Sequence, residues 1–246
     1  SVEVFTVGQG KPVLFISATG LAASSWHKQL SKWHDRYQLY VMHNPGYGLS
    51  SVKKDISLDH VAKLFMQAFD VLGVQEKVNI VGSCYGGVLG QTLARNYQHR
   101  VESLTLAGSF YQNFGIQGSG SDDISVDMMR EGMEQMGSAF GRDFQAIKNR
   151  RLDSQPTDAA IDAAHNMLDA SQCVNPLVVM RYTAQIHELE QEHLLSEISV
   201  PVLSISGTED TIVKPVVAQE IANKVQRGRF ESIEGSAHYP YISHPD

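Results

Sequence analysis

Apolar residues along the chain occur in short unbroken runs that are separated by longer amphipathic stretches. Unbroken runs rich in Val, Ile and Leu are typical of strands that are buried on both faces of a parallel sheet. An alternating segment at residues 2–7 predicts a further strand at an edge of that sheet. The buried strands are expected at residues 13–17, 39–42, 77–81, 101–106, 200–206 and 229–233.

Helical periodicity fills most of the stretches between these strands. Residues 58–72 carry apolar side chains at a spacing that places them on one face of a helix, and Gly73 follows as a typical helix end. Strands that alternate with helices predict an α/β fold, in which helices cover both faces of a mostly parallel twisted sheet. The other helices are expected at residues 22–33, from the turn at 82–87 to about residue 97, and at 216–225.

The pattern changes after about residue 111. No clear strand is expected at residues 112–195, where a Gly/Ser/Asp-rich stretch is followed by helical segments. We therefore expect a core formed by residues 1–111 and 196–246, with a helical lid inserted between them. Flexible methionine side chains suit irregular helix contacts or a deformable cover over an acyl chain. Six of the eight methionines lie in this insertion: Met128, Met129, Met133, Met136, Met167 and Met180.

Composition and net charge limit the kinds of partner that we expect this chain to bind. The 246-residue chain carries a formal net charge of −7, with 42% hydrophobic and 19% charged residues, as a soluble globular protein does. An acidic chain without a Lys/Arg cluster argues against nucleic acid and anionic membranes as partners. Its two cysteines, Cys84 and Cys173, form no CxxC pair, and the histidines lack metal-ligand spacing, so no metal is expected. With no signal-peptide pattern at the start, we expect a cytoplasmic location.

The segment at residues 78–87 carries the strongest chemical signal. A strand runs into a Gly-x-nucleophile-x-Gly turn, with Gly82 and Gly86 on either side of Cys84, and a helix follows. A nucleophile at such a sharp turn needs small neighbours two residues away, which the glycines supply. The N–H groups at the start of the helix point at the thiol, where they stabilise a thiolate and an oxyanion. Cys84 is therefore predicted to be a nucleophile; Ser83 is out of register with the glycines.

This turn resembles the nucleophile elbow of the α/β-hydrolase family, in which the central residue is usually Ser. The resemblance implies a triad in the chain order nucleophile, acid, histidine. The acid matches Asp210 in a loop after a strand, with Glu209 as the alternative, and the histidine matches His238 after the last strand, with His244 as second choice. In such a triad, Asp210 holds the imidazole of His238 in one tautomer, and His238 takes the proton of Cys84.

The resemblance also implies an oxyanion hole made of two backbone N–H groups. One belongs to Tyr85, directly after the nucleophile. The other is expected at Leu21, in a loop that reads Ala-Thr-Gly-Leu where the family commonly has His-Gly, so that Thr19 departs from the pattern. A second departure is the turn at residues 43–50, His-Asn-Pro-Gly-Tyr-Gly-Leu-Ser, which resembles the family's Asp-x-Pro-Gly-x-Gly-x-Ser turn with His43 at the Asp position. That turn is structural in the family.

A cysteine at the elbow predicts acyl transfer through a thioester. A His-paired thiolate attacks an acyl carbonyl, and the thioester then passes its acyl group to water, an amine, a hydroxyl or a thiol. Dienelactone hydrolases and some thioesterase domains in the same family use Cys. We therefore expect an ester or thioester hydrolase, or an acyltransferase, that needs no cofactor. Its substrate is a small-molecule or carrier-bound acyl group with an apolar portion, and an acyl carrier protein is a candidate partner.

Three alternatives remain open at this point. The fold also supports small-ligand receptors with little or no turnover, which ligand-dependent thermal stabilisation without cleavage of any ester would favour. An engineered replacement of a catalytic Ser by Cys would give the same residue at position 84. A carbon–carbon bond hydrolase is the third alternative, whereas a dehalogenase needs Asp at the elbow.

Overall fold

The computed structural model describes residues 1–113 and 174–245. The strands are β1 (Val4–Gly8), β2 (Lys11–Ile16), β3 (Tyr37–Met42), β4 (Val78–Ser83), β5 (Val101–Ala107), β6 (Val202–Gly207) and β7 (Gly228–Ile233). The helices are α1 (His27–Trp33), α2 (Leu58–Val71), α3 (Tyr85–Asn96), α6 (Pro176–His187), α7 (Pro215–Lys224) and α8 (Pro240–Ser243). Two 3₁₀-helices, η1 (Ala23–Trp26) and η2 (Glu192–Glu197), complete the described elements.

One seven-stranded sheet organises the molecule, with the order β1-β3-β2-β4-β5-β6-β7. Strand β1 pairs antiparallel with β3 at one edge, and every other pairing is parallel. The register sets Val13 of β2 beside Leu39 of β3 and Asn79 of β4. The expected edge strand and the expected mostly parallel sheet are both confirmed.

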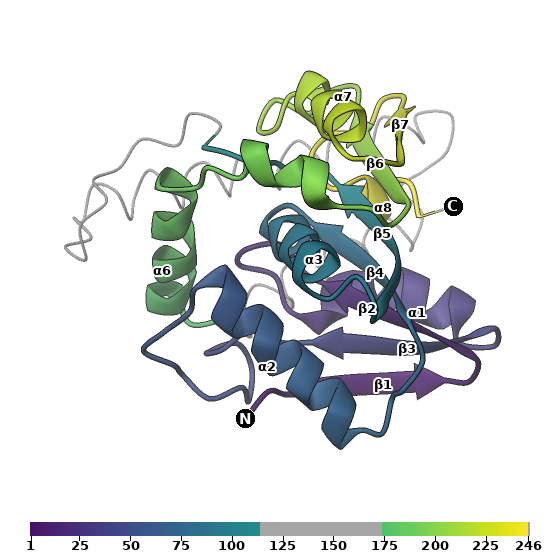
Figure 1. Ribbon diagram of the computed structural model, residues 1–246, viewed down its shortest axis with the longest axis vertical. Coiled ribbons are helices and arrows are strands. Elements are labelled where there is room, and N and C mark those ends of the chain that lie inside the picture. Colours follow the sequence, from purple (N-terminus) through teal and green to yellow (C-terminus); the bar gives the residue numbers. More distant parts are fainter. Residues whose placement is uncertain (114–173, 246) are drawn as a thin grey trace, which may run out of the picture.

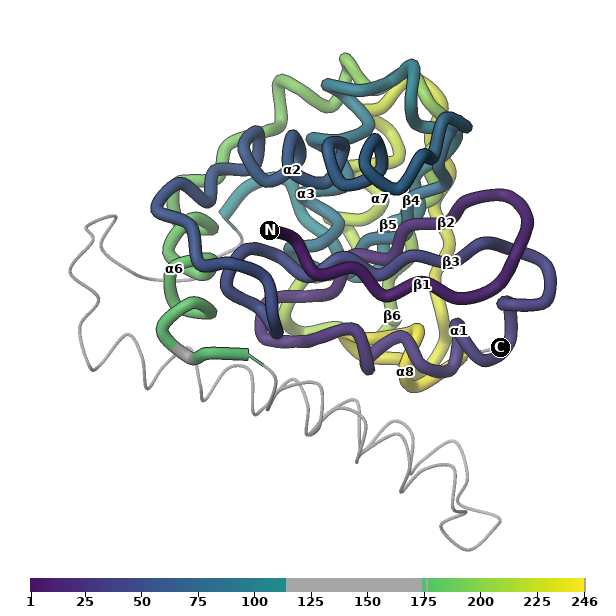
Figure 2. The backbone as a smooth tube through the Cα atoms, turned by 90° about the horizontal axis from the view of Figure 1, so that it is seen from below, coloured from purple at the N-terminus to yellow at the C-terminus, as the bar shows by residue number. Residues whose placement is uncertain are grey.

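Helices cover both faces of this sheet. Helices α2, α3 and α7 lie on one face, α1 and α8 lie on the other, and α6 stands beyond one end of the strands (Figures 1 and 2). Strand β2 is apolar at successive positions because it meets both layers. Val13 and Phe15 join the buried cluster around Trp26, whereas Leu14 and Ile16 join the cluster around Phe65. The carboxyl ends of the parallel strands meet at one edge of the sheet, where loops of an α/β fold form a site.

Two expectations differ from the structure or fall outside it. The helix expected at residues 22–33 is split into η1 and α1, because Ser25 returns both its N–H (3.1 Å) and its hydroxyl (2.8 Å) to the Ala22 carbonyl. Of the expected lid, the structure describes α6 and most of η2. Residues 114–173 lie outside the described part, so the domain boundaries stay a prediction. Those residues include Cys173 and five of the six methionines; Met180 lies on α6 and is half-buried.

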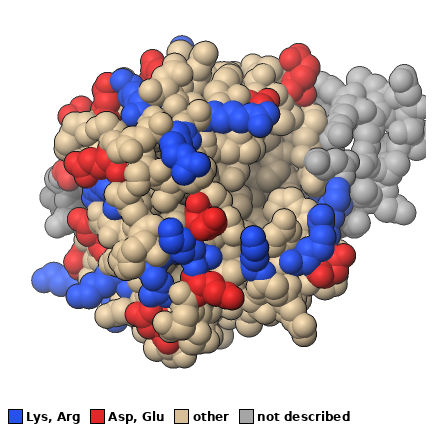
Figure 3. Space-filling model, turned by 45° about the vertical axis from the view of Figure 1, so that its right-hand side comes forward, with Lys and Arg blue, Asp and Glu red and all other residues tan. Residues whose placement is uncertain are grey.

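One face of the molecule mixes both signs of charge. Lys and Arg side chains are interspersed with Asp and Glu on the face drawn in Figure 3. Within residues 1–113 and 174–245, no helix is long and apolar enough to cross a membrane. The same residues contain no group of three or more His, Cys, Asp or Glu side chains placed to hold a metal ion.

Candidate active site

Cys84 sits at the sharp turn between β4 and α3, with φ 52° and ψ −121°. Among the described residues it is the only non-glycine residue with a positive φ. That conformation costs free energy and is held by the surrounding structure. A Cβ on Gly82 would clash with the Gly86 carbonyl, and a Cβ on Gly86 would clash with the Ile16 carbonyl, so both glycines are required by close backbone approach. The elbow geometry expected from the sequence is therefore present.

Hydrogen bonds to β5 and to the loop that follows it hold the backbone of the elbow at Cys84. The Cys84 N–H donates to the Ala107 carbonyl (3.0 Å), and the Ser109 hydroxyl donates to the Cys84 carbonyl (3.0 Å). The Gln91 amide in turn donates to the Phe110 carbonyl (2.9 Å) and to the Ser109 hydroxyl (3.3 Å). Sequence reasoning missed both Ser109 and Gln91. For Gln91, the available signal was a polar residue in a helix whose other buried residues are mostly apolar.

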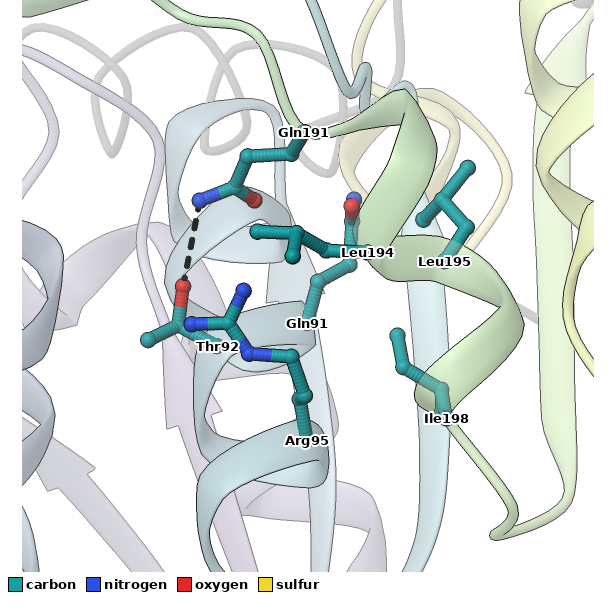
Figure 4. Close-up of a pocket in the computed structure, with 7 residues that line it drawn as sticks. All are labelled: Gln91, Thr92, Arg95, Gln191, Leu194, Leu195 and Ile198. Carbon is teal, nitrogen blue, oxygen red and sulfur yellow. Dashed lines mark hydrogen bonds between the residues drawn. The ribbon is translucent and has the colours of Figure 1, made fainter.

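A small pocket lies next to Gln91, between α3 and η2 (Figure 4). The Gln191 amide donates to the Thr92 hydroxyl (3.5 Å) across it. The pocket holds none of the site residues predicted from the sequence, and it begins two helical turns beyond the elbow. It is lined by Gln91, Thr92, Arg95, Gln191, Leu194, Leu195 and Ile198.

The predicted acid and histidine come together at the elbow. Nδ1 of His238 lies 2.9 Å from Oδ2 of Asp210, and the other ring nitrogen is left for the hydrogen bond to the Cys84 thiol. The second oxygen of Asp210 accepts the N–H groups of Ile212 (2.9 Å) and Val213 (3.0 Å), which fix the orientation of the carboxylate. All three members of the predicted triad are buried. Their arrangement orients one imidazole between a carboxylate and a thiol.

Two glycines allow the acid and histidine loops to approach so closely. A Cβ on Gly207, at the end of β6, would clash with the backbone carbonyls of Ser236 and Ala237. Gly108 has φ 58°, and a Cβ there would lie 2.6 Å from the His238 carbonyl oxygen. Larger residues at either position would push the histidine loop away from the elbow.

The alternative residues lie outside this cluster. Glu209 is exposed, and its backbone N–H donates to the Ser236 carbonyl (2.9 Å). His244 places Nδ1 2.9 Å from the hydroxyl of Ser243. The geometry therefore favours Asp210 over Glu209 as the residue that orients His238.

The charges around His238 favour its protonated form. Burial by itself lowers the pKa of His238, but the negative charges of a Cys84 thiolate and of Asp210, together with their hydrogen bonds to the ring, raise this pKa well above its usual value. The pKa shift of His238 is therefore set by its two neighbours, Cys84 and Asp210, against the effect of burial.

The two expected oxyanion donors differ in their surroundings. Tyr85 is the first residue of α3, so its N–H has no acceptor within the helix and is available to a ligand. The N–H of Leu21 instead donates to the Ala18 carbonyl (3.1 Å) in a tight turn. Leu21 would have to give up this bond to serve as a donor, so the structure does not support the role expected for it.

The N–H groups of the two preceding residues in this loop differ from each other. The Gly20 N–H donates to the hydroxyl of Tyr47 (3.0 Å), whereas no residue in the described part of the chain accepts the N–H of Thr19. The Thr19 hydroxyl is also buried without a hydrogen-bond partner there. The sequence motif could not show which N–H groups of this loop are used within its own turn.

His43 fastens the 43–50 turn to this loop. Its Nδ1 lies 2.8 Å from Oε2 of Glu3, and its Nε2 accepts the N–H of Ala23 (2.8 Å), so the ring is neutral with its proton on Nδ1. Burial lowers the pKa of His43, although the hydrogen bond and charge of Glu3 oppose this shift. The histidine at the family's Asp position thus has a structural role that depends on its being uncharged.

A profile of the alpha/beta hydrolase fold matches residues 11–245, and this chain therefore belongs to the α/β-hydrolase fold family. It is 25% identical over 195 residues to a pimeloyl-[acyl-carrier protein] methyl ester esterase from Neisseria meningitidis, covering 74% of this chain but only 60% of that protein. It is 23% identical to the polyketide synthase ThaQ from Burkholderia thailandensis, covering 98% of this chain and 12% of that protein. An alpha/beta hydrolase fold protein from Nakamurella multipartita superposes with a TM-score of 0.78 at 18% identity, covering 100% of this chain and 91% of that one.

Proposed function

We propose that this protein cleaves acyl esters or thioesters through a thioester on Cys84. The observation that carries the proposal is the hydrogen-bonded series from Asp210 through His238 to a thiol held at a strained elbow. A nucleophile, an orienting acid and a base within mutual hydrogen-bond reach define acyl transfer by covalent catalysis.

The reaction follows from the charges on these three residues. The Cys84 thiolate attacks the acyl carbonyl carbon, and the new C–S bond places the carbonyl electron pair on oxygen as an oxyanion. The backbone N–H groups of Tyr85 and Thr19 are the proposed donors to this oxyanion. As the oxyanion collapses, the bond to the leaving alcohol or thiol breaks, and the leaving group takes the proton of the His238 imidazolium. The neutral imidazole then takes a proton from water as the water oxygen attacks the thioester carbon. The C–S bond breaks, the acid leaves, and the Cys84 thiolate and the His238 imidazolium are restored.

A carrier-bound acyl chain is the proposed substrate. The relatives named as pimeloyl-[acyl-carrier protein] methyl ester esterases act on an ester whose acyl chain is attached to a carrier protein, and this chain resembles one of them over 74% of its length. Cys84 belongs to a buried cluster of tyrosines and aliphatic side chains, which suits a substrate with an apolar acyl chain.

Transfer of the acyl group to an acceptor other than water is a second candidate. It is favoured by the match of almost the whole chain to a small part of a polyketide synthase, and by the nucleophile itself. A thioester is more reactive toward amines and thiols than an ordinary ester is, so a cysteine enzyme is suited to transfer as well as hydrolysis. Product analysis with and without an added amine or thiol acceptor separates the two outcomes.

Selective alkylation tests the proposed nucleophile. Iodoacetamide is expected to label Cys84 first and to abolish turnover of a chromogenic acyl ester in proportion to labelling. Cys173→Ala is the matched control, because it removes the other thiol and should leave both labelling and turnover in place. Full labelling of Cys84 with turnover retained would contradict the proposal.

A further inference from the structure

Tyr47 lies in the 43–50 turn and contacts the loop at residues 18–21, which we call the oxyanion loop. Its backbone is fixed in that turn, since its N–H donates to the Asn44 carbonyl (2.9 Å) and its carbonyl accepts the Ser50 N–H (2.9 Å). Its ring lies edge-on against that of Tyr182 on α6, with 5.5 Å between the ring centres, and only 1% of the residue is exposed. The phenol is therefore held in one position.

The hydroxyl of Tyr47 accepts a hydrogen bond but donates none to the described residues. Its oxygen accepts the Gly20 N–H (3.0 Å), which makes it the neighbour of the Thr19 amide. No residue in the described ranges accepts the hydroxyl hydrogen in return. A buried donor without an acceptor is costly, and an acceptor supplied by a bound ligand is one explanation for such a donor.

The other two tyrosines of this aromatic cluster use their hydrogens within the protein. The Tyr182 hydroxyl donates to the Pro45 carbonyl (3.1 Å), and the Tyr85 hydroxyl donates to Oε1 of Gln185 (2.6 Å). Tyr47 differs from both, although all three rings pack edge-on in one buried group. Of these three tyrosines, Tyr47 is therefore the one whose hydroxyl has no acceptor within residues 1–113 and 174–245.

The spare hydrogen lies in the electrostatic field of the nucleophile. Tyr47, Cys84 and Tyr85 belong to one buried cluster together with Ala18 and Leu21 of the oxyanion loop. Burial, and to a smaller extent negative charge at Cys84, raises the pKa of Tyr47 far above its usual value. The phenol therefore keeps its proton at every working pH and acts as a donor.

We propose that the Tyr47 hydroxyl donates a hydrogen bond to the acyl oxygen of the substrate, as a side-chain member of the oxyanion site beside the Thr19 and Tyr85 amides. One hydroxyl has two functions in this arrangement. Its oxygen takes the Gly20 N–H and so orients the loop, and its hydrogen stabilises the charge that develops on the substrate. The inference rests on the proposed acylation of Cys84.

The test compares acylation with alkylation of the same sulfur in Tyr47→Phe. Acylation builds an oxyanion, whereas attack on the methylene carbon of iodoacetamide does not. Losing one oxyanion donor is expected to slow acylation by a saturating acyl thioester about 100-fold. Alkylation of Cys84 should stay within about twofold of the wild-type rate, because the nucleophile and its histidine are unchanged.

Tyr182→Phe is the matched control, since it makes the same chemical change on the adjacent ring and should keep acylation within about twofold. A loss of acylation smaller than threefold in Tyr47→Phe would overturn the inference. So would a parallel loss of alkylation, which would mean that the elbow itself is disturbed. A wild-type protein that is never acylated would instead remove the proposed function, so that the two failures are distinguishable.

A second variant separates donation from loop orientation. Incorporating 3-fluorotyrosine at position 47 keeps the oxygen that accepts the Gly20 N–H but makes the hydroxyl a stronger donor and a weaker acceptor. An apolar aldehyde forms a hemithioacetal with Cys84, whose oxygen occupies the place of the oxyanion. The fluorinated protein should bind the aldehyde more tightly than wild type, and Tyr47→Phe about tenfold more weakly. Weaker binding in the fluorinated protein would contradict hydrogen donation by Tyr47.

Discussion

Two buried histidines of this protein meet a carboxylate in almost the same way but have opposite pKa shifts. Nδ1 of His238 lies 2.9 Å from Asp210, and Nδ1 of His43 lies 2.8 Å from Glu3. Nevertheless, the pKa of His238 is raised well above its usual value, whereas that of His43 is lowered. The carboxylate alone therefore does not decide the charge of either ring.

The partner of the second ring nitrogen explains the difference. That nitrogen of His43 accepts the Ala23 N–H, and it must keep its lone pair to do so, which disfavours protonation. In His238 it faces the Cys84 thiol, and a thiolate there favours protonation. Asp210 adds to this contrast because its side chain is fully buried, while that of Glu3 is 18% exposed and partly screened by water. The second ring nitrogen thus separates the two histidines: that of His43 is used within a loop, and that of His238 faces the thiol.

Replacing each histidine in turn should give the largest difference between the two regions. His238→Gln removes the proton acceptor and is expected to lower kcat/KM for an acyl ester by about 10⁴-fold or more. His43→Gln should lower it by less than about tenfold, since the ring lies behind the loop rather than at the sulfur. Steady-state assays of the two variants check this, and comparable losses in both would contradict the division of roles.

The acid of the triad should have the next largest effect. Asp210→Asn keeps the shape of the side chain but stabilises the wrong tautomer of His238, and it is expected to lower kcat/KM about 10³- to 10⁴-fold. Glu209→Gln is the matched control at the adjacent exposed position and should change kcat/KM by less than about twofold. Equal losses in the two variants would mean that Asp210 has no special relation to the histidine.

The structural histidine should be evident in stability rather than in turnover. His43→Ala leaves the Ala23 N–H and one bond of the Glu3 carboxylate unsatisfied, and it is expected to lower the free energy of unfolding by about 1–3 kcal/mol. In urea unfolding, Glu3→Gln should cost less, because its amide oxygen can still accept the hydrogens of His43 and of the Leu49 N–H. A His43→Ala protein as stable as wild type would disprove the role of this ring.

The smallest predicted effect is a change in a single titration. Cys84→Ser removes the thiolate charge that helps to raise the pKa of His238, so this pKa should fall toward the usual range. The proton should then leave the ring at lower pH than in wild type, as NMR of the imidazole can measure. The pKa of His43 should stay below its usual value in both proteins. A His238 pKa that is unchanged by Cys84→Ser would show that the thiolate does not contribute.

Much of the fold follows from the sequence because burial on two faces leaves a clear pattern. Strand β2 is apolar at adjacent positions since each side chain meets a different helical layer. The elbow could be predicted for a similar reason: backbone contact around Cys84 excludes any side chain at Gly82 and Gly86. The loops of Asp210 and His238 could be predicted from their order along the chain together with the family resemblance.

The remaining features depend on contacts that the sequence does not encode locally. Leu21 was expected as an oxyanion donor, but its N–H closes a turn on Ala18, and only the folded backbone reveals this. Ser109 and Gln91 support the elbow through bonds that join separate elements. Tyr47 was part of a turn with an expected structural role, and its spare hydrogen becomes visible only when its partner Gly20 is known.

Trapping the acyl-enzyme tests the central claim most directly. Wild-type protein is mixed with an acyl thioester, quenched in acid within one turnover, and analysed by mass spectrometry of the intact chain and of the tryptic peptide 78–95. The account predicts one acyl group per chain, attached to Cys84, released by hydroxylamine at neutral pH and absent after prior alkylation. An acyl group on Ser83, or turnover that proceeds with no acylated peptide at any quench time, would contradict it.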